Sequence, residues 1–410
     1  MGEELTSIKQ EIVPIQPRAH AEAQFVDEAL LLTDAPVPGR RLRPPTERRA
    51  PAQEVEAEVV TSWERLAALQ AEWRDLAKSA VEPNPFYEPW MLLPALKHLG
   101  AGRRLEVCLV FEKKAKGVHR LCGLFPVERK RGRAELWVHR YCYLGAPLLR
   151  RGCERAAISC WLDTLREPVV RLDDLPAGGA LRMHLVDELS ERGWASLVSA
   201  AWTRAVLRRA PTAEHYLASA LQGTRRKEFR RQRKRLAEQG ELACEELPAG
   251  ADPSAFIDEF LQLEQAGWKG RDGVCGARDR GFLQEMAAQA AHAGRLQLLA
   301  LRLSGKPVAL KVNLLSGTSA FAFKITFDEA FSRYSPGVQL ELENIERAHK
   351  QPGLLTMDSC AASNRFMINH LWPDRREIQT VFFSTGSRLG ELQIALVPLI
   401  HLARRLLRRA

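Results

Sequence analysis

The sequence lacks the short motifs that identify several large classes of enzyme. It contains no HExxH zinc-binding helix, no GxSxG serine elbow, no Walker A loop and no glycine-rich dinucleotide fingerprint. Metalloprotease, serine hydrolase, kinase and dehydrogenase interpretations therefore have no support. The function therefore has to be inferred from the order of the predicted helices and strands.

Paired cysteines and long apolar runs are also missing. The eight cysteines include no CxxC pair, which favours buried, reduced thiols over a structural zinc site or a disulfide framework. The sequence begins MGEELTSIKQEIV, without a basic segment followed by an apolar one, and no apolar run of about 18 residues occurs. We expect a cytoplasmic protein with no metal site.

What the chain has is enough apolar content for more than one core. It is 410 residues long, 46% hydrophobic, with a net charge of +10 and a pI of about 9.3. This length predicts two domains or more, and the charge favours acidic partners. Residues 1–55 are rich in proline and charge, which predicts a disordered tail with order beginning near Glu56.

The remaining chain shows the same order of elements twice. Each half reads as strand, helix, helix, three antiparallel strands, helix, strand, helix and strand. In the first half, the third of the antiparallel strands is expected over AELWVHRYCYLG. No residue-level repeat is visible, but the shared order suggests a tandem duplication of one α+β unit.

The most informative stretch covers residues 296–360. It predicts three hairpin-linked strands, a loop containing Ser-Pro-Gly, a helix and a further strand ending LLTMDSC. This order places a helix N-terminus beside the open end of a strand. Unpaired N–H groups and the helix dipole at such a position suit the phosphates of a carrier such as coenzyme A.

Four segments of the sequence resemble the GNAT acyltransferase superfamily. They are NPFYEPWM, RRKEFRRQRKRLAEQGEL, GWKGRDG and, most specifically, FKITFDEAFSRYSPGVQLELENIERA running on to MDSCAASNRFMINHLWPDRR. The resemblance is to the branch called CelD-like, or cellulose-biosynthesis-associated, acetyltransferases, which is related to the tandem-domain Fem-type aminoacyltransferases. It covers roughly residues 56–385.

The resemblance implies an α+β fold of two tandem GNAT-like domains, with mixed, mostly antiparallel sheets flanked by helices. It implies a cofactor-free domain over 56–205, a catalytic domain over 206–386 and a basic amphipathic C-terminal helix over 387–410. The implied activity is transfer of an acyl group, most simply acetyl from acetyl-CoA, to the amine of a small molecule or sugar. A link to exopolysaccharide or cell-envelope synthesis is implied as well.

Two other functions are compatible with the same resemblance. One is an aminoacyl-tRNA-dependent transferase of the Fem type, and the other is a non-catalytic assembly factor with a degenerate GNAT fold. The second remains open because the phosphate loop departs from the family pattern. The family loop, Gln/Arg-x-x-Gly-x-Gly/Ala, has two glycines, whereas this chain has a single glycine in its equivalent, Arg333, Tyr334, Ser335, Pro336, Gly337 and Val338.

The candidate cofactor-binding residues are those of this loop: Arg333, Tyr334, Ser335, Gly337 and Val338. A serine at the N-cap, a proline in the first turn and a glycine that permits close approach suit an anion cradle. The same residues also suit an ordinary capped helix start.

The candidate catalytic residues are Lys324, Asp328 and Asp358. Lys324 alternates with its neighbours Phe323 and Ile325, so we expect it to face away from them and to bind a phosphate or a carboxylate. Asp328 would orient or deprotonate the amine. For both, a surface salt bridge at the strand end is the alternative. Asp358 would act as a base at the end of an apolar strand, or would cap the following helix.

Three further segments have two interpretations each. Trp268 and Lys269 form a substrate lid in a glycine-rich loop or a plain connector. The basic helix from Arg225 to Arg235 contacts RNA in the Fem-type alternative, but the absence of an evident aromatic stacking platform favours a solvated linking helix. Residues 389–409 dock on an anionic membrane, peripheral to the inner membrane, or pack on the domain and end in a basic tail.

Overall fold

The computed structural model describes residues 54–114, 117, 119–267 and 276–407. The predicted disordered tail, apart from its last two residues, lies outside the described residues. So does the predicted lid pair, Trp268 and Lys269. The first described strand begins at Val55, one residue before the position expected from the sequence.

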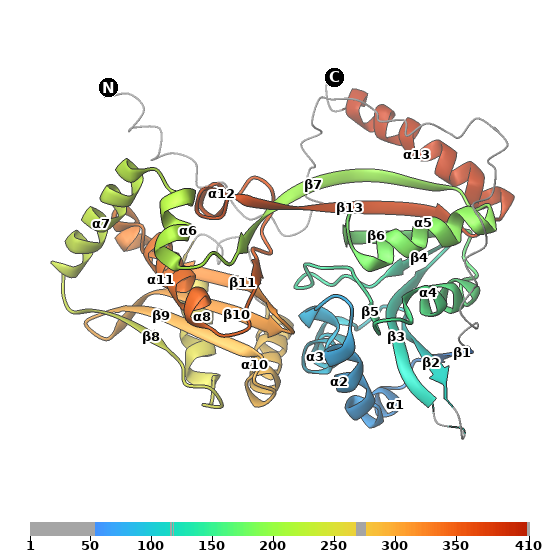
Figure 1. Cartoon of the computed structure of the whole chain (residues 1–410), viewed down its shortest axis with the longest axis horizontal. Coiled ribbons are helices and arrows are strands. Elements are labelled where there is room, and N and C mark those ends of the chain that lie inside the picture. Colours follow the sequence, from blue (N-terminus) through green and yellow to red (C-terminus); the bar gives the residue numbers. More distant parts are fainter. Residues whose placement is uncertain (1–53, 115–116, 118, 268–275, 408–410) are drawn as a thin grey trace.

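The described part of the first half contains seven strands and the helices that cover them (Figure 1). In chain order these are β1 (Val55–Val60), α1 (Trp63–Ala68), α2 (Gln70–Ser79), η2 (Pro85–Tyr87), α3 (Pro89–Leu99), β2 (Leu105–Lys113), β3 (His119–Lys130), β4 (Arg133–Leu136), β5 (Leu148–Leu149), α4 (Glu154–Asp163), β6 (Val169–Pro176), α5 (Ala180–Arg192) and β7 (Ser196–Arg208).

The second half repeats this plan with two additional helices in front. It contains α6 (Ala213–Ala220), α7 (Gly223–Ala237), β8 (Leu242–Glu246), α8 (Ser254–Ala266), α10 (Ala277–His292), β9 (Leu296–Leu303), β10 (Lys306–Ser316), β11 (Ser319–Phe327), η4 (Glu329–Tyr334), α11 (Pro336–Lys350), β12 (Thr356–Asp358), α12 (Phe366–Leu371), β13 (Asp374–Ser384) and α13 (Arg388–Leu407).

All of these strands join one continuous sheet. Its order is β1-β2-β3-β4-β6-β13-β7-β12-β11-β10-β9-β8, with β5 pairing to β3 beside this path. Only the β4–β6 and β11–β12 pairs are parallel. The predicted α+β class with a mixed, mostly antiparallel sheet is confirmed.

The two halves exchange their last strands at the centre of this sheet. β13, from the end of the second half, pairs with β6 and β7 of the first half, and β7 in turn pairs with β12 of the second half. Figure 1 shows β7 and β13 as the two long strands that connect the halves. The predicted boundary at 205/206 falls inside β7, and the division into domains stays a prediction.

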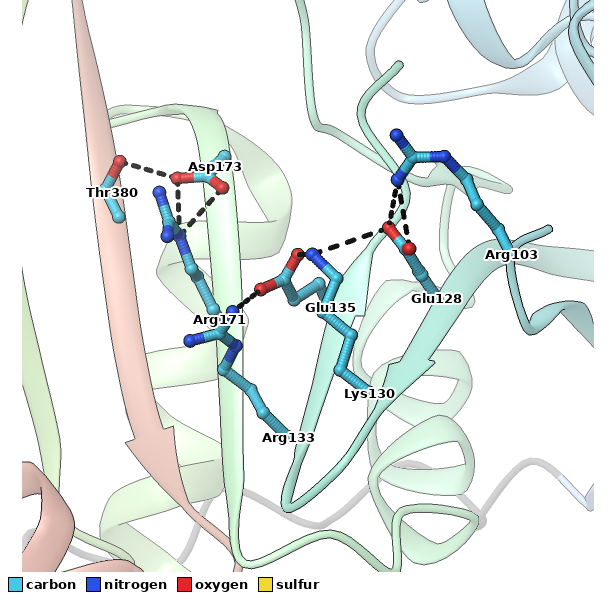
Figure 2. Close-up of polar contacts among 8 residues, drawn as sticks. All are labelled: Arg103, Glu128, Lys130, Arg133, Glu135, Arg171, Asp173 and Thr380. Carbon is cyan, nitrogen blue, oxygen red and sulfur yellow. Dashed lines mark hydrogen bonds and ion pairs between the residues drawn. The ribbon is translucent and has the colours of Figure 1, made fainter. Parts of the chain in front are cut away.

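A row of charged side chains crosses the sheet at this exchange (Figure 2). Glu128 of β3 lies directly opposite Glu135 of β4, an unfavourable pairing of like charges. Lys130 offsets it, because its Nζ lies 3.6 Å from Glu128 and 2.5 Å from Glu135. The row ends at Thr380 of β13, which donates a hydrogen bond of 2.9 Å to Asp173 of β6. This hydrogen bond helps to hold β13 beside β6.

Helices cover both faces of the sheet. In the second half, Leu298 and Ala300 of β9 face the helices α8 and α10, whereas Leu299 and Leu301 face the opposite side, toward α11. The cluster under α8 and α10 continues without interruption into α1, α2 and α3 of the first half. Helix α3 packs against α10, and His98 Nε2 lies 2.7 Å from Glu285 across that contact. The halves therefore share one core.

The C-terminal helix α13 lies against β6, β7 and β13. Ile394 is buried in that contact, while Leu389, Leu392 and Leu399 are each more than half exposed. No helix within the described ranges has the length and apolar content needed to cross a bilayer. Contact of α13 with a membrane surface stays a prediction.

A buried ion pair fixes α11 against the sheet. Lys311 Nζ of β10 lies 2.7 Å from Glu341 of α11, and both side chains are at most 2% exposed. Asn344 donates a second hydrogen bond to Glu341 and accepts one from Asn313 of β10. A buried pair of this kind is costly to break on one side, because the remaining charge stays in the core.

We expect Lys311→Met to lower the free energy of unfolding by about 3–5 kcal/mol, since it leaves Glu341 charged and buried. Adding Glu341→Gln removes that charge and keeps the acceptor for Asn344, so the double variant should recover about 1–2 kcal/mol. Urea unfolding of the three proteins measures both values. A double variant less stable than Lys311→Met would contradict this account.

Candidate functional site

An opening in the sheet lies between β11 and β12. The two strands pair in parallel only over Ser319–Phe321 and Thr356–Asp358. Strand β12 then ends, whereas β11 continues to Phe327. Beyond Phe321, β11 therefore has no further pairing with β12, and the two strands separate at this point.

A β-bulge lies on β11 at the start of this opening. Val312 of β10 pairs with Lys324, but the next residue, Asn313, pairs with Ala322, so Phe323 is the extra residue. Bulges of this kind re-aim side chains and are frequent beside active sites.

The bulge overturns the expected direction of Lys324. Strict alternation predicted that Lys324 and Phe323 face opposite sides, but both reach Tyr141. The Tyr141 ring lies 6.2 Å from the Phe323 ring and 5.3 Å from Lys324 Nζ. The extra residue breaks the two-residue period, which is why the prediction is wrong.

The predicted phosphate loop opens α11. Ser335 is the N-cap residue, in the left-handed conformation with φ 53°, and its side chain makes no capping hydrogen bond. Pro336, which has no N–H group, opens the first turn, and the N–H groups of Gly337 and Val338 that follow it have no carbonyl acceptor within the helix. An added Cβ at Gly337 would lie 3.5 Å from the Phe327 ring, in ordinary contact.

The five predicted cofactor-binding residues divide into two groups. Ser335, Gly337 and Val338 lie at the helix start. Tyr334 is buried in the core between α11 and β9, and the Arg333 guanidinium lies 4.6 Å from the Tyr334 ring centre. Their role in binding a cofactor stays a prediction.

Asp358 ends β12 as part of a buried ion cluster. Its carboxylate lies 2.8 Å from the Arg204 guanidinium of β7 and 3.2 Å from that of Arg376 on β13, and it accepts a hydrogen bond from the Cys360 backbone. Both oxygens are thus held by donors from neighbouring segments. The alternative role as a helix cap is wrong, because Arg365 precedes α12.

Cys360 lies beside this cluster in a strained backbone conformation, with φ 52°. Burial raises the pKa of its thiol well above the usual value, and the Asp358 charge adds to this effect. A thiol with a raised pKa is a weak nucleophile, because the thiolate is the reactive form.

The other two predicted catalytic residues have defined structural contacts. Asp328 is the N-cap of η4, where its Oδ1 accepts a hydrogen bond from the Ala330 N–H. Lys324 forms an ion pair of 3.0 Å with Glu264 of α8, and the two side chains are only 11% and 5% exposed. This pair is buried, unlike the surface salt bridge that was the alternative. The catalytic roles of both residues stay predictions.

The first half supplies residues that the sequence did not assign to the site. The strand expected over AELWVHRYCYLG is confirmed only at its start: β4 ends at Leu136, and residues 137–147 leave the sheet before β5. Tyr141 and Tyr143 from this loop pack on Phe323 of the bulge. Arg204 binds the Tyr143 carbonyl as well as Asp358. The aromatic run was visible in the sequence, but its contact with the other half was not.

Among the residues that the structure describes, no group of three or more His, Cys, Asp and Glu side chains could hold a metal ion. The seven cysteines in those ranges are free thiols. Burial raises the pKa of Cys108 and Cys122 to about 12.

Residues 223–366 match the family model of an acetyltransferase (GNAT) domain. The matched range contains α11, the bulged strand and the opening beside it. This part of the chain is therefore similar to GNAT acetyltransferase domains.

Solved structures extend the likeness to both halves. The crystal structure of FemX superimposes with a TM-score of 0.54 at 10% identity, covering 80% of this chain and 96% of FemX. A conserved protein of unknown function from Bacteroides thetaiotaomicron gives 0.50 at 11%, covering 77% and 97%. A tandem GNAT protein from the clavulanic acid biosynthesis pathway gives 0.42 at 14%, covering 82% and 99%. No curated protein sequence matches the chain.

At these identities the superpositions define the fold alone. The predicted fold of tandem GNAT-like units is confirmed, and so is the structural similarity to Fem-type proteins. The CelD-like branch stays a prediction.

Arg204 is expected to contribute most to the Asp358 cluster. Arg204→Met leaves a buried carboxylate with only the partly exposed Arg376, and we expect it to lower the free energy of unfolding by about 3 kcal/mol. Arg376→Met should cost about 1 kcal/mol or less, because this side chain is 29% exposed. Urea unfolding compares the two variants, and equal losses would contradict the assignment.

Proposed function

We propose that this protein is an N-acyltransferase that moves an acyl group from an acyl-CoA, most simply acetyl-CoA, to an amine. The observation that carries the proposal is the opening between β11 and β12, with the Phe323 bulge beside it and the α11 N-terminus following β11. An extended thioester arm would fit between β11 and β12 where the two strands separate. The phosphates of the same donor fit the unpaired N–H groups at the start of α11.

The chemistry proposed for this site is direct transfer. The amine nitrogen attacks the thioester carbonyl, the new C–N bond forms, and the C–S bond breaks. The leaving sulfur takes up a proton equivalent to the one that the amine loses. Backbone N–H groups of the bulged strand would stabilise the negative charge that develops on the carbonyl oxygen.

A second candidate is an aminoacyl-tRNA donor, as in the Fem-type proteins that the chain resembles. Helix α7 favours it, because most of its cationic side chains are exposed, among them Arg225, Lys227 and Arg230. Arg231 is paired with Glu228, and Arg233 with Glu343 of α11. A surface of this charge suits a phosphate backbone. The proposed link to polysaccharide or envelope synthesis applies to either donor.

Thermal unfolding with acetyl-CoA, free coenzyme A and total tRNA as separate ligands tests these proposals. We expect acetyl-CoA to raise the melting temperature of the protein, since a ligand at 100 times its Kd adds about 2.7 kcal/mol of stability. Gly337→Leu should abolish the shift by filling the space before the first turn of α11. Gly178→Leu is the matched control, because a Cβ there meets no atom within 4 Å.

Each result has a defined meaning. A shift that Gly337→Leu leaves unchanged would place the donor elsewhere. A shift with tRNA alone would favour the second candidate, and no shift with any donor would favour a non-catalytic role.

A further inference from the structure

The ion pair between Lys324 and Glu264 lies in an aromatic enclosure between the halves. Lys324 Nζ is 3.0 Å from Glu264 Oε1, 5.3 Å from the centre of the Tyr141 ring and 5.9 Å from that of Phe260. Tyr141 comes from the first half, and Phe260 and Glu264 from α8. Placing two opposite charges among aromatic rings costs solvation free energy. This cost is a reason to look for a functional role of the pair.

The pair lies beside the opening, on the face of the sheet opposite α11. Lys324 directly follows the bulge residue Phe323, which belongs to the cluster under α8 and α10. Helix α11, where the donor phosphates are proposed to bind, packs on the other face. An acceptor that approaches the thioester from the side away from α11 would meet Lys324 and Glu264.

The charges around this face determine which acceptor it favours. Arg140 pairs with Asp279 at 2.5 Å, and the Tyr141 hydroxyl donates a hydrogen bond to the same carboxylate. Tyr141 thus lies between two ion pairs, Lys324–Glu264 and Arg140–Asp279, and the charges of each pair balance.

A simple amine is a cation at neutral pH. Binding to Glu264, it would add a positive charge beside Lys324 and take away the carboxylate that Lys324 pairs with. An amine that also carries a carboxylate adds no net charge. Its ammonium can pair with Glu264 and its carboxylate with Lys324, so every charge keeps a partner.

We propose that the Lys324–Glu264 pair is an acceptor-recognition site for an amine that bears a carboxylate, such as an amino acid or an amino sugar acid. On binding, the ligand breaks the Lys324–Glu264 pair and forms one ion pair with each of these two residues in its place. This inference rests on the proposed acyltransferase activity, and it assigns Lys324 to specificity.

Amine pairs that differ by a single carboxylate test the proposal. L-lysine and cadaverine form one such pair, and L-ornithine and putrescine form another. Release of the coenzyme A thiol from acetyl-CoA gives kcat/KM for each amine. We expect the full-length protein to prefer the amino acid by about tenfold or more.

Three variants separate recognition from stability. Lys324→Met should reduce the preference to about twofold or less, whereas Lys324→Arg, which keeps the cation, should retain most of it. Lys97→Met removes another lysine from a lysine–glutamate pair between the halves, with Glu285, at an exposed position. It should leave the preference unchanged. A purely structural role of Lys324 would lower the rates of both amines together and keep their ratio.

The proposal is overturned by a preference for the bare amine, by a ratio that Lys324→Met does not change, or by no thiol release with either amine while acetyl-CoA binds. Failure of acetyl-CoA to bind the unmodified protein is a different result. It removes the proposed donor and this inference with it.

Discussion

The exchange of β7 and β13 is the constraint on which the rest of the structure depends. Each strand pairs with neighbours from the other half, so neither half can complete its sheet alone. Backbone hydrogen bonds in the centre of a sheet are obligatory, since an unpaired group there costs free energy. The relative position of the two halves is therefore set by the main chain, with the shared core under α3 and α10 packing around it.

This constraint makes the candidate site a product of both halves. Arg204 reaches Asp358 because β7 lies directly beside β12, and Arg376 reaches it from β13 on the other side of β7. The loop over 137–147 brings Tyr141 and Tyr143 onto the bulged strand. The half that is predicted to bind no cofactor of its own therefore still contributes residues to the candidate site.

The sequence predicted the local elements well and their long-range partners poorly. The three hairpin strands, the start of α11 at Pro336 and the strand ending at Asp358 follow from turn residues and apolar periods, which are local signals. The direction of Lys324 depends on a bulge opposite Val312, and Arg204 meets Asp358 across 154 residues. The hydrophobic periodicity of a single segment carries no information about contacts between residues so far apart in the sequence. The β4 strand was overextended because a buried aromatic loop has the same composition as a strand.

The position of β13 in the chain also has a consequence for synthesis on the ribosome. This strand begins at Asp374, after every other strand of the sheet has been translated, yet it belongs between β6 and β7. Until it arrives, the facing edges of β6 and β7 stay open, and open edges are where nascent chains associate wrongly. The nascent protein therefore has to keep these two edges apart while some 165 residues follow β7. Strand β13, which joins the halves, is also the strand that covers these open edges.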